Sequence, residues 1–396
     1  MGVADACGFP RESCGTVVKV TTALEELLLR HVKAGTVPGA VALMGSGDVA
    51  VVAAGVASID GVPMRDDAIM RIQSMTKAIT SVAALRLVEA GRLGLDQSLE
   101  EWLPELADRR VLSYPTAALD DTVPAQRAIT LRHLLTNASG YGMAIVDSPL
   151  QKAMAENGTE AGPEPPSLGS EEWLTRLAEL PLAFQPGEGW RYHHSFSLLG
   201  ILVARLTGRS LGEHLAEDLI GPLGMIDTAL WVPEEKLDRL PAAYIHGDDG
   251  LVETEPAGGG FYAGPPPFDV SHGELVSTAR DFHRFARMLA DGGRVDGEPV
   301  ISTDHLRQMT SDQVPAEYKT PESFFPGFWE DMGWGFGVGV KRKGSQSGRY
   351  GWSGGQGTDF FVGRDGTVGI LLTQVELGVH LWPMVAEFQA LHAPSS

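Results

Sequence analysis

Positive charge and cysteine are both scarce in this chain, and each shortage excludes a class of protein. The 396 residues contain 31 Lys and Arg against 51 Asp and Glu, which gives a formal net charge of −20. Because nucleic acids and anionic membrane surfaces repel an acidic protein, we expect neither as a partner. The two cysteines, Cys7 and Cys14, both lie near the N-terminus. The chain therefore has no disulfide framework and no cysteine metal site.

Long apolar runs are also missing. No stretch approaches the roughly 18 apolar residues of a membrane span, and residues 1–16 lack the apolar segment of a signal peptide. The sequence therefore predicts no membrane association, and a cytoplasmic location is the default expectation. The histidines show no H-E-x-x-H spacing, and runs such as Gly258-Gly259-Gly260 lack the lysine of a phosphate loop. We therefore predict no metal and no cofactor.

Strand patterns occur at both ends of the chain. Residues 40–44 and 49–57 are predicted as two apolar strands joined by a Gly-rich turn, and four more strands are predicted after residue 332. Helical periodicity dominates the segments between them. This order predicts an α+β fold, in which an antiparallel sheet built from both chain ends, with flanking helices, carries an inserted, mostly helical domain. The later strands are 333–340, 350–353, 358–362 and 368–373.

The domain boundaries follow from these patterns. We predict an N-terminal tail at 1–19, a sheet domain from 20–72 and 273–396, and a helical domain at 73–272, with the active site between the two domains. A helix is expected at 24–34 and another at 382–392. The segments 141–169 and 256–270 are rich in Gly and Pro, so we expect them to be loops that shape a pocket.

The stretch from Arg71 to Gly91 has the features of a buried helix that carries a nucleophile. Its helical interior contains only Arg86 and Glu89 as charged residues after Lys77. Ser74 lies near the helix start, and Lys77 follows at i+3 on the same face, within hydrogen-bonding reach. Burial and the helix dipole both disfavour an ammonium, so Lys77 can accept the Ser74 proton. The alternative for an isolated motif is an N-capping serine with a surface lysine.

Six landmarks along the chain resemble the serine β-lactamase and penicillin-binding-protein superfamily in its class C-like branch. Within this branch the chain is most similar to the family VIII carboxylesterases and related acyltransferases, from about residue 20 to 390. In order along the chain, the landmarks are Ser74-Met75-Thr76-Lys77, Leu135 to Gly140, Pro186-Gly187-x-x-Trp190-x-Tyr192, Phe282 to Leu289, Gly333 to Gly337, and Trp352-Ser353-Gly354-Gly355.

The resemblance implies a role for each motif. Ser74 is implied as the nucleophile and Lys77 as its proton acceptor, while Tyr192 helps to activate the serine and passes the proton to the leaving group. A phenol beside a lysine can have a lowered pKa and act as a general base, which we expect of Tyr192. The backbone N–H groups of Ser74 and Gly355 are implied as the oxyanion hole. The third motif, Trp352-Ser353-Gly354, is implied to bind substrate on a strand that lines the cleft.

Two positions depart from the penicillin-binding pattern. His194 replaces the usual Asn, and Trp352 replaces the usual Lys or His, so the side chains that grip an amide and a carboxylate are missing. A tryptophan at this position is common in the esterase branch. We expect His194 either to bind substrate as a hydrogen-bond donor or to be a structural histidine. His272 lies where relatives are glycine-rich, and a structural role is expected for it.

Several functions remain open from the sequence. The leading hypothesis is a hydrolase that cleaves carboxylic esters through an acyl-Ser74 intermediate, with a small-molecule ester or acyl compound as its substrate. The alternatives are transfer of the acyl group to an alcohol or amine, hydrolysis of β-lactams or D-peptides, and an inactive binding protein. Gly351 to Gly355 also fits G-x-S-x-G, which would make Ser353 the nucleophile of an α/β-hydrolase elbow if a helix followed. No oligomeric state is predicted.

Overall fold

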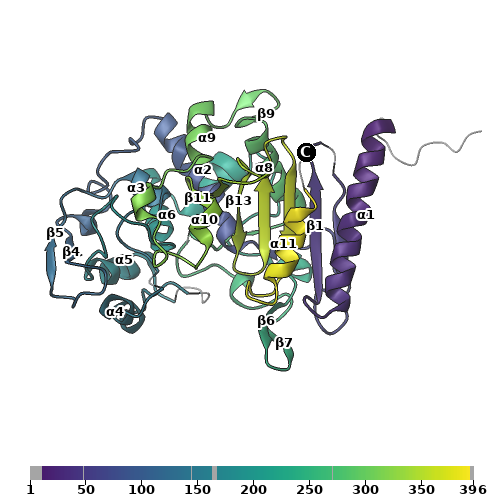
Figure 1. The fold of residues 1–396 in the computed structure, drawn as a ribbon, viewed down its shortest axis with the longest axis horizontal. Helices are drawn as coiled ribbons and strands as arrows, with labels where there is room; N and C mark the ends of the chain where they lie inside the picture. The colour runs from purple at the N-terminus through teal and green to yellow at the C-terminus, as the bar shows by residue number, and fades with distance from the viewer. Residues whose placement is uncertain (1–10, 48, 144, 163–166, 270, 393–396) are drawn as a thin grey trace, which may run out of the picture.

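A seven-stranded antiparallel sheet forms the centre of the molecule in the computed structural model, which describes residues 11–47, 49–143, 145–162, 167–269 and 271–392 (Figure 1). The first two strands of the chain join the last five. In spatial order the strands are β11 (Met332–Trp334), β12 (Gly339–Lys341), β13 (Tyr350–Gly354), β14 (Thr358–Val362), β15 (Val368–Leu372), β1 (Gly39–Gly45) and β2 (Val52–Gly55).

The two chain ends meet where β1 pairs with β15, with Val41 opposite Leu372. Both faces of these strands are apolar, so each face needs a cover of helices. Val41 packs into one buried cluster together with α8 (Ala279–Ala290), while Ala42 packs into a second cluster with α1 (Arg11–Lys33) and α11 (Trp382–Ala390). Figure 1 shows α1 and α11 beside β1 at one end of the molecule. The predicted fold class is confirmed.

The other end of the molecule is mainly helical (Figure 1). Its centre is α6 (His194–Thr207), whose apolar residues are nearly all buried and which packs against α2 (Thr76–Glu89). Because α2 is buried along most of its length, it fits the predicted core helix. The smaller helices of this part are α3 (Leu131–Leu135), α4 (Pro149–Asn157), α5 (Ser170–Ala178) and α7 (Leu211–Leu215).

Short elements complete the fold. Four two-stranded ribbons lie outside the main sheet, and two further helices belong to the C-terminal half. The ribbons pair β3 (Met70–Arg71) with β8 (Val276–Ser277), β4 (Arg110–Leu112) with β5 (Thr122–Pro124), β6 (Ala243–Gly247) with β7 (Gly250–Glu255), and β9 (Arg294–Val295) with β10 (Glu298–Pro299). The helices are α9 (Thr303–Met309) and α10 (Phe328–Asp331).

Several local predictions differ from the structure. Helix α1 begins at Arg11 rather than at 24, so it includes part of the predicted tail, while residues 1–10 and Cys7 lie outside the described residues. The predicted strand 333–340 is a hairpin of β11 and β12, because its glycines allow a tight turn. The predicted loop 141–169 contains α4, which Ser148 caps through the Gln151 N–H.

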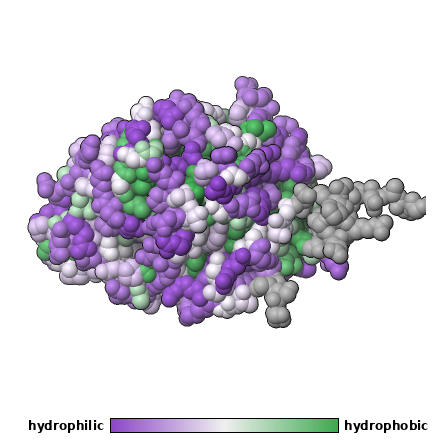
Figure 2. Space-filling view, turned by 90° about the horizontal axis from the view of Figure 1, so that it is seen from above, coloured by the Kyte–Doolittle hydropathy of each residue, from purple (hydrophilic) through white to green (hydrophobic). Residues whose placement is uncertain are grey.

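Hydrophilic side chains cover most of the face shown in Figure 2, and apolar side chains form separate small patches. This surface agrees with the acidic composition and with the absence of long apolar runs. Among the described residues, no helix combines the length and apolar character needed to cross a bilayer.

Gly337, in the turn between β11 and β12, packs closely against α2, the helix that carries Lys77. It has a φ of 73°, and a Cβ there would lie 2.6 Å from the Lys77 carbonyl oxygen and 2.3 Å from Ser81 Oγ. We expect Gly337→Ala to lower the free energy of unfolding by about 3 kcal/mol, the upper end for point mutations, measured by urea denaturation. Gly344→Ala is the control, because Gly344 has a φ of 76° and no atom near its Cβ position. Equal losses in both variants would contradict the predicted clash.

Candidate active site

Ser74 and Lys77 are held together at the start of α2. Ser74 lies in a 3₁₀ turn at Gln73–Met75, and Lys77 lies in the first turn of the α-helix that follows. Lys77 Nζ is 2.9 Å from Ser74 Oγ and also donates a hydrogen bond to the carbonyl oxygen of His272. Burial lowers the pKa of Lys77 well below its usual value of 10.5. An amine that loses its proton this readily can accept one from the serine hydroxyl.

Tyr192 lies just before α6 and faces the same pair. Its phenol hydrogen-bonds with Ser74 and accepts a 2.6 Å bond from Trp352 Nε1, and Lys77 Nζ is 4.4 Å from the centre of its ring. The expected lowering of its pKa is wrong, since burial raises the pKa of Tyr192 above 10. Burial also lowers the pKa of the neighbouring Lys77 amine, which weakens its ability to stabilise a phenolate. Tyr192 therefore remains a proton-carrying phenol.

Trp352 belongs to an aromatic cluster that the sequence analysis missed. The indole of Trp352 contacts the Trp334 ring edge-on, with the ring centres 4.7 Å apart, and it also packs against Phe328. Trp190 and Phe324 extend this cluster around Tyr192. Trp352 thus positions the phenol by hydrogen bonding and packing. Its predicted contact with substrate stays a prediction.

The end of β13 lies against the nucleophile turn. Thr358 Oγ1 donates to the Ile72 carbonyl oxygen at 3.0 Å, and a Cβ on Gly354 would come within 2.4 Å of the same oxygen. Only glycine therefore fits at this crossing. Gly355 is the next residue after Gly354, so it lies close to the segment that leads into Ser74. The oxyanion hole of the Ser74 and Gly355 N–H groups stays a prediction that this arrangement supports.

Ser353 faces away from the Ser74 pair. Successive residues of a strand point to opposite faces, and while Trp352 reaches Tyr192, Ser353 Oγ donates a 2.7 Å bond to Asp359 Oδ1. Burial raises the pKa of Asp359 to about 6, and Gln389 of α11 hydrogen-bonds to both carboxylate oxygens. A strand, β14, follows Ser353 where an elbow needs a helix. The elbow alternative is wrong, and the Ser353 side chain is not placed to bind substrate at Ser74.

The histidines lie on the other side of Lys77. His194 is fully buried, its Nε2 donates to the Thr159 carbonyl oxygen at 2.7 Å, and its ring stacks on Trp173. These contacts fit the structural alternative for His194, and its role in substrate binding stays a prediction. His272 holds Lys77 through its backbone oxygen, while its ring Nδ1 is 2.8 Å from Ser197 Oγ. His193, not singled out from the sequence, packs against the His272 ring, with the two ring planes tilted by 41°.

Gln73 is another residue that the sequence analysis missed. It directly precedes the nucleophile and has a φ of 48°, which is uncommon for a residue with a side chain. Its Nε2 donates a 2.8 Å hydrogen bond to the buried Tyr262 hydroxyl. This bond helps to hold the backbone that presents Ser74 in a strained conformation. Neither residue belongs to a motif, so the sequence offered no signal for the pair.

Metal-ligating groups do not gather at this site. Within the described part of the chain, no cluster of three or more His, Cys, Asp or Glu side chains has the arrangement of a metal site. The chemistry available here is that of a hydroxyl, an amine and a phenol in contact with one another.

The fold, with a serine, a lysine and a tyrosine gathered at the start of α2, defines the class of protein: proteins of the β-lactamase fold. The chain belongs to the β-lactamase family, because residues 24–389 match the family model described as Beta-lactamase.

Three known proteins illustrate the relationship. Protein Rv1367c of Mycobacterium tuberculosis is 36% identical over 309 residues, which cover 78% of this chain and 75% of the relative. Lovastatin esterase of Penicillium rubens is 32% identical over 264 residues, or 65% of this chain and 64% of the esterase. The solved structure of EstCE1, a hydrolase with promiscuous acyltransferase activity, superposes with a TM-score of 0.77 at 22% identity, over 95% of this chain and 99% of that one.

Proposed function

We propose that this protein is a serine carboxylesterase that cleaves small or medium carboxylic esters through an acyl-Ser74 intermediate. The single observation that carries the proposal is the buried Lys77 amine 2.9 Å from the Ser74 hydroxyl. A lysine with a lowered pKa is the base that a serine nucleophile needs near neutral pH. The esterase among the relatives adds support for this substrate class.

Acylation begins with proton transfer from Ser74 Oγ to the neutral Lys77 Nζ as the oxygen attacks the ester carbonyl carbon. The carbonyl oxygen becomes an oxyanion, which the N–H groups of Ser74 and Gly355 are proposed to stabilise. When the tetrahedral intermediate collapses, the bond to the alkoxide breaks. Tyr192 gives its proton to the departing alkoxide and regains one from Lys77, so the amine is neutral again and the alcohol leaves complete.

Deacylation repeats these steps with water. A water molecule attacks the acyl carbon while one of its protons passes to the Lys77 amine. Ser74 then leaves as its oxygen regains a proton. An alcohol or amine in place of water would give the transferase reaction, which several relatives' names describe. Because the missing Asn and Lys side chains normally hold an amide and a carboxylate, we rank β-lactam or D-peptide cleavage below both.

The acyl-enzyme and its fate can be measured together. The protein is incubated with p-nitrophenyl butyrate, rapidly quenched in acid and analysed by mass spectrometry, where we expect a butyryl group on the peptide that contains Ser74. Product analysis with and without an added alcohol then separates hydrolysis from transfer. Free butyrate as the main product supports the esterase, and butyryl ester of the added alcohol as the main product favours the transferase. Absence of any acylated peptide, together with unchanged substrate, would show that the proposed function is wrong.

A further inference from the structure

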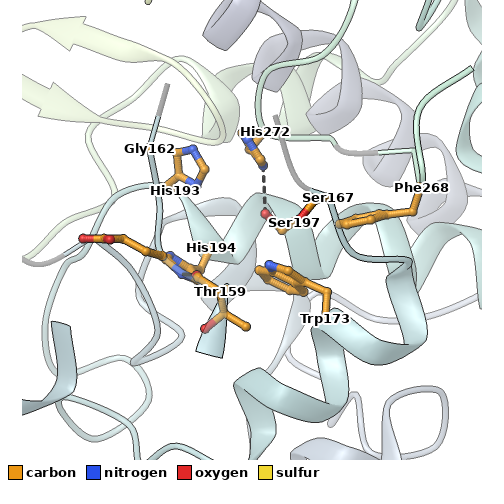
Figure 3. Close-up of a pocket in the computed structure, with 11 residues that line it drawn as sticks. Thr159, Gly162, Ser167, Trp173, His193, His194, Ser197, Phe268 and His272 are labelled. Atoms are coloured by element: carbon orange, nitrogen blue, oxygen red, sulfur yellow. Dashed lines mark hydrogen bonds between the residues drawn. The ribbon is translucent and has the colours of Figure 1, made fainter. Parts of the chain in front are cut away.

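A cavity of about 200 Å³ lies beside the catalytic residues, between α5, α6 and the segment before β8. Figure 3 shows His193 and His272 on one side of it, Trp173 and Phe268 on another, and Thr159 and His194 at its floor. The remaining lining residues are Gly158, Glu160, Gly162, Ser167 and Ser197.

The cavity shares a wall with the site at Ser74. The backbone oxygen of His272 accepts a hydrogen bond from Lys77 Nζ, and His193 directly follows Tyr192 in the chain. The two imidazole rings lie 3.7 Å apart between their centres. A substrate attached to Ser74 would therefore lie next to the residues that form the cavity wall.

Hydrogen-bonding groups of both kinds are available in the cavity. Burial lowers the pKa values of His193 and His272 well below 6.5, so both rings are neutral near pH 7. A neutral imidazole carries one donor and one acceptor nitrogen, which match the two roles of a hydroxyl group. Ser197 lies 2.8 Å from His272 Nδ1 and fixes that ring.

The charges of the lining residues and the volume of the cavity limit the class of ligand that it can bind. None of the described lining residues is Lys or Arg, and Glu160 would repel an anion, so a carboxylate or phosphate is disfavoured. Trp173 and Phe268 provide an apolar wall for carbon atoms. At about 30 Å³ for each water-sized group, the volume holds roughly six or seven non-hydrogen atoms.

The backbone conformation of His193 also indicates that the cavity is a ligand site. This residue has a φ of 98° and a ψ of −77°, a conformation that a residue with a side chain rarely adopts. Strain of this kind persists only where the surrounding structure enforces it, and it concentrates at ligand sites. Here it sets the imidazole against His272 at the cavity wall.

We propose that this histidine-lined cavity binds a short, uncharged, hydroxyl-bearing group of the substrate and so gives the enzyme a preference for hydroxylated esters. The inference rests on the proposed function of Ser74. The group can come from the acyl chain or from the alcohol of the ester, and the experiment distinguishes these two sources.

Binding is measured in the Ser74→Ala protein, where the esters stay intact, by ligand-observed NMR titration. One arm compares methyl 3-hydroxybutyrate with methyl butyrate, and the other compares 2,3-dihydroxypropyl butyrate with propyl butyrate. Because each net hydrogen bond contributes about 1 kcal/mol, we expect the hydroxylated ester to bind on the order of tenfold more tightly in one arm. The arm that shows the preference identifies the source.

Two further changes, each added to Ser74→Ala, test the cavity itself. His193→Gly removes one ring without a backbone penalty, since glycine tolerates a positive φ, and Ser197→Ala frees the His272 ring. We expect each to reduce the preference to below about threefold. The matched control is Ser195→Ala, because Ser195 is also buried in α6 but bonds to Ser139 Oγ at 2.8 Å, outside the cavity.

The proposal is overturned if neither arm shows a preference, or if the preference survives in both cavity variants. Turnover of the plain esters by the wild-type protein is measured in parallel. If the Ser74→Ala protein shows no binding preference while the wild-type protein turns over the plain esters normally, the cavity proposal alone is refuted. Absence of turnover refutes the proposed function, while the ratio of dissociation constants still decides whether the cavity selects hydroxyl groups.

Discussion

Ser74→Ala is expected to abolish turnover of p-nitrophenyl butyrate, with kcat lowered on the order of 10⁴-fold or more. The hydroxyl oxygen is the atom proposed to form the acyl bond, and no other nucleophilic side chain among the described residues lies within 3 Å of Lys77 Nζ. Removing one hydroxyl from a partly buried turn leaves the packing of α2 in place, so the fold should be retained. The measurement is p-nitrophenol release, with circular dichroism as the check on folding.

Ser353→Ala is the matched control for this loss. It removes the hydroxyl of the competing G-x-S-x-G serine, which donates to Asp359 of β14 on the side of the sheet away from Tyr192. We expect kcat to stay within about tenfold of the wild type, since a lost hydrogen bond costs about 1 kcal/mol. Full activity in Ser74→Ala, or complete loss in Ser353→Ala alone, would contradict the assignment of the nucleophile.

Lys77→Arg is expected to lower kcat/KM on the order of 10²- to 10⁴-fold, the usual contribution of a general base. A guanidinium stays charged at every accessible pH, so it cannot take the proton of Ser74. In the wild type, kcat/KM should rise with pH as Lys77 loses its proton. The midpoint of this rise should lie well below pH 10.5, because burial lowers the pKa of Lys77. The raised pKa of Tyr192 keeps the phenol protonated, so activity should persist to about pH 10.

Two controls accompany the pH profile. Lys341→Arg makes the same change in the ion pair with Asp331, away from Ser74, and should leave the profile unchanged. The Lys77→Arg variant should lose the rise in kcat/KM that the wild type shows. If wild-type activity instead rises only near pH 10.5, the predicted lowering of the Lys77 pKa is wrong. If the Lys77→Arg variant keeps the wild-type rise, Lys77 is not the base.

The sequence predicted the parts of the structure that depend on pattern. Apolar runs at both ends gave the sheet, and the spacing of Ser74 and Lys77 on one helical face gave their contact. The side of β13 that Ser353 occupies also follows from strand alternation, once Trp352 is known to face Tyr192. The division of the chain at residues 72 and 273 stays a prediction.

What the sequence could not predict depends on burial in three dimensions. The pKa of Tyr192 rises because the phenol is buried, whereas the sequence analysis expected a lysine beside it to lower that pKa. The contact between the His193 and His272 rings joins residues 79 positions apart, and a single sequence carries no mark of that contact. The bond between Gln73 and Tyr262 is hidden for the same reason.

The pairing of β1 with β15 also fixes the order in which the chain can fold during synthesis. Leu372, the partner of Val41, is synthesised more than 300 residues after it. Until then one edge of β1 has no partner, and the apolar faces that α1 and α11 cover together remain open. The helical segments between these strands can form first because their contacts are local. The central sheet is therefore completed last, which leaves the nascent chain dependent on protection of an exposed strand edge for most of its translation.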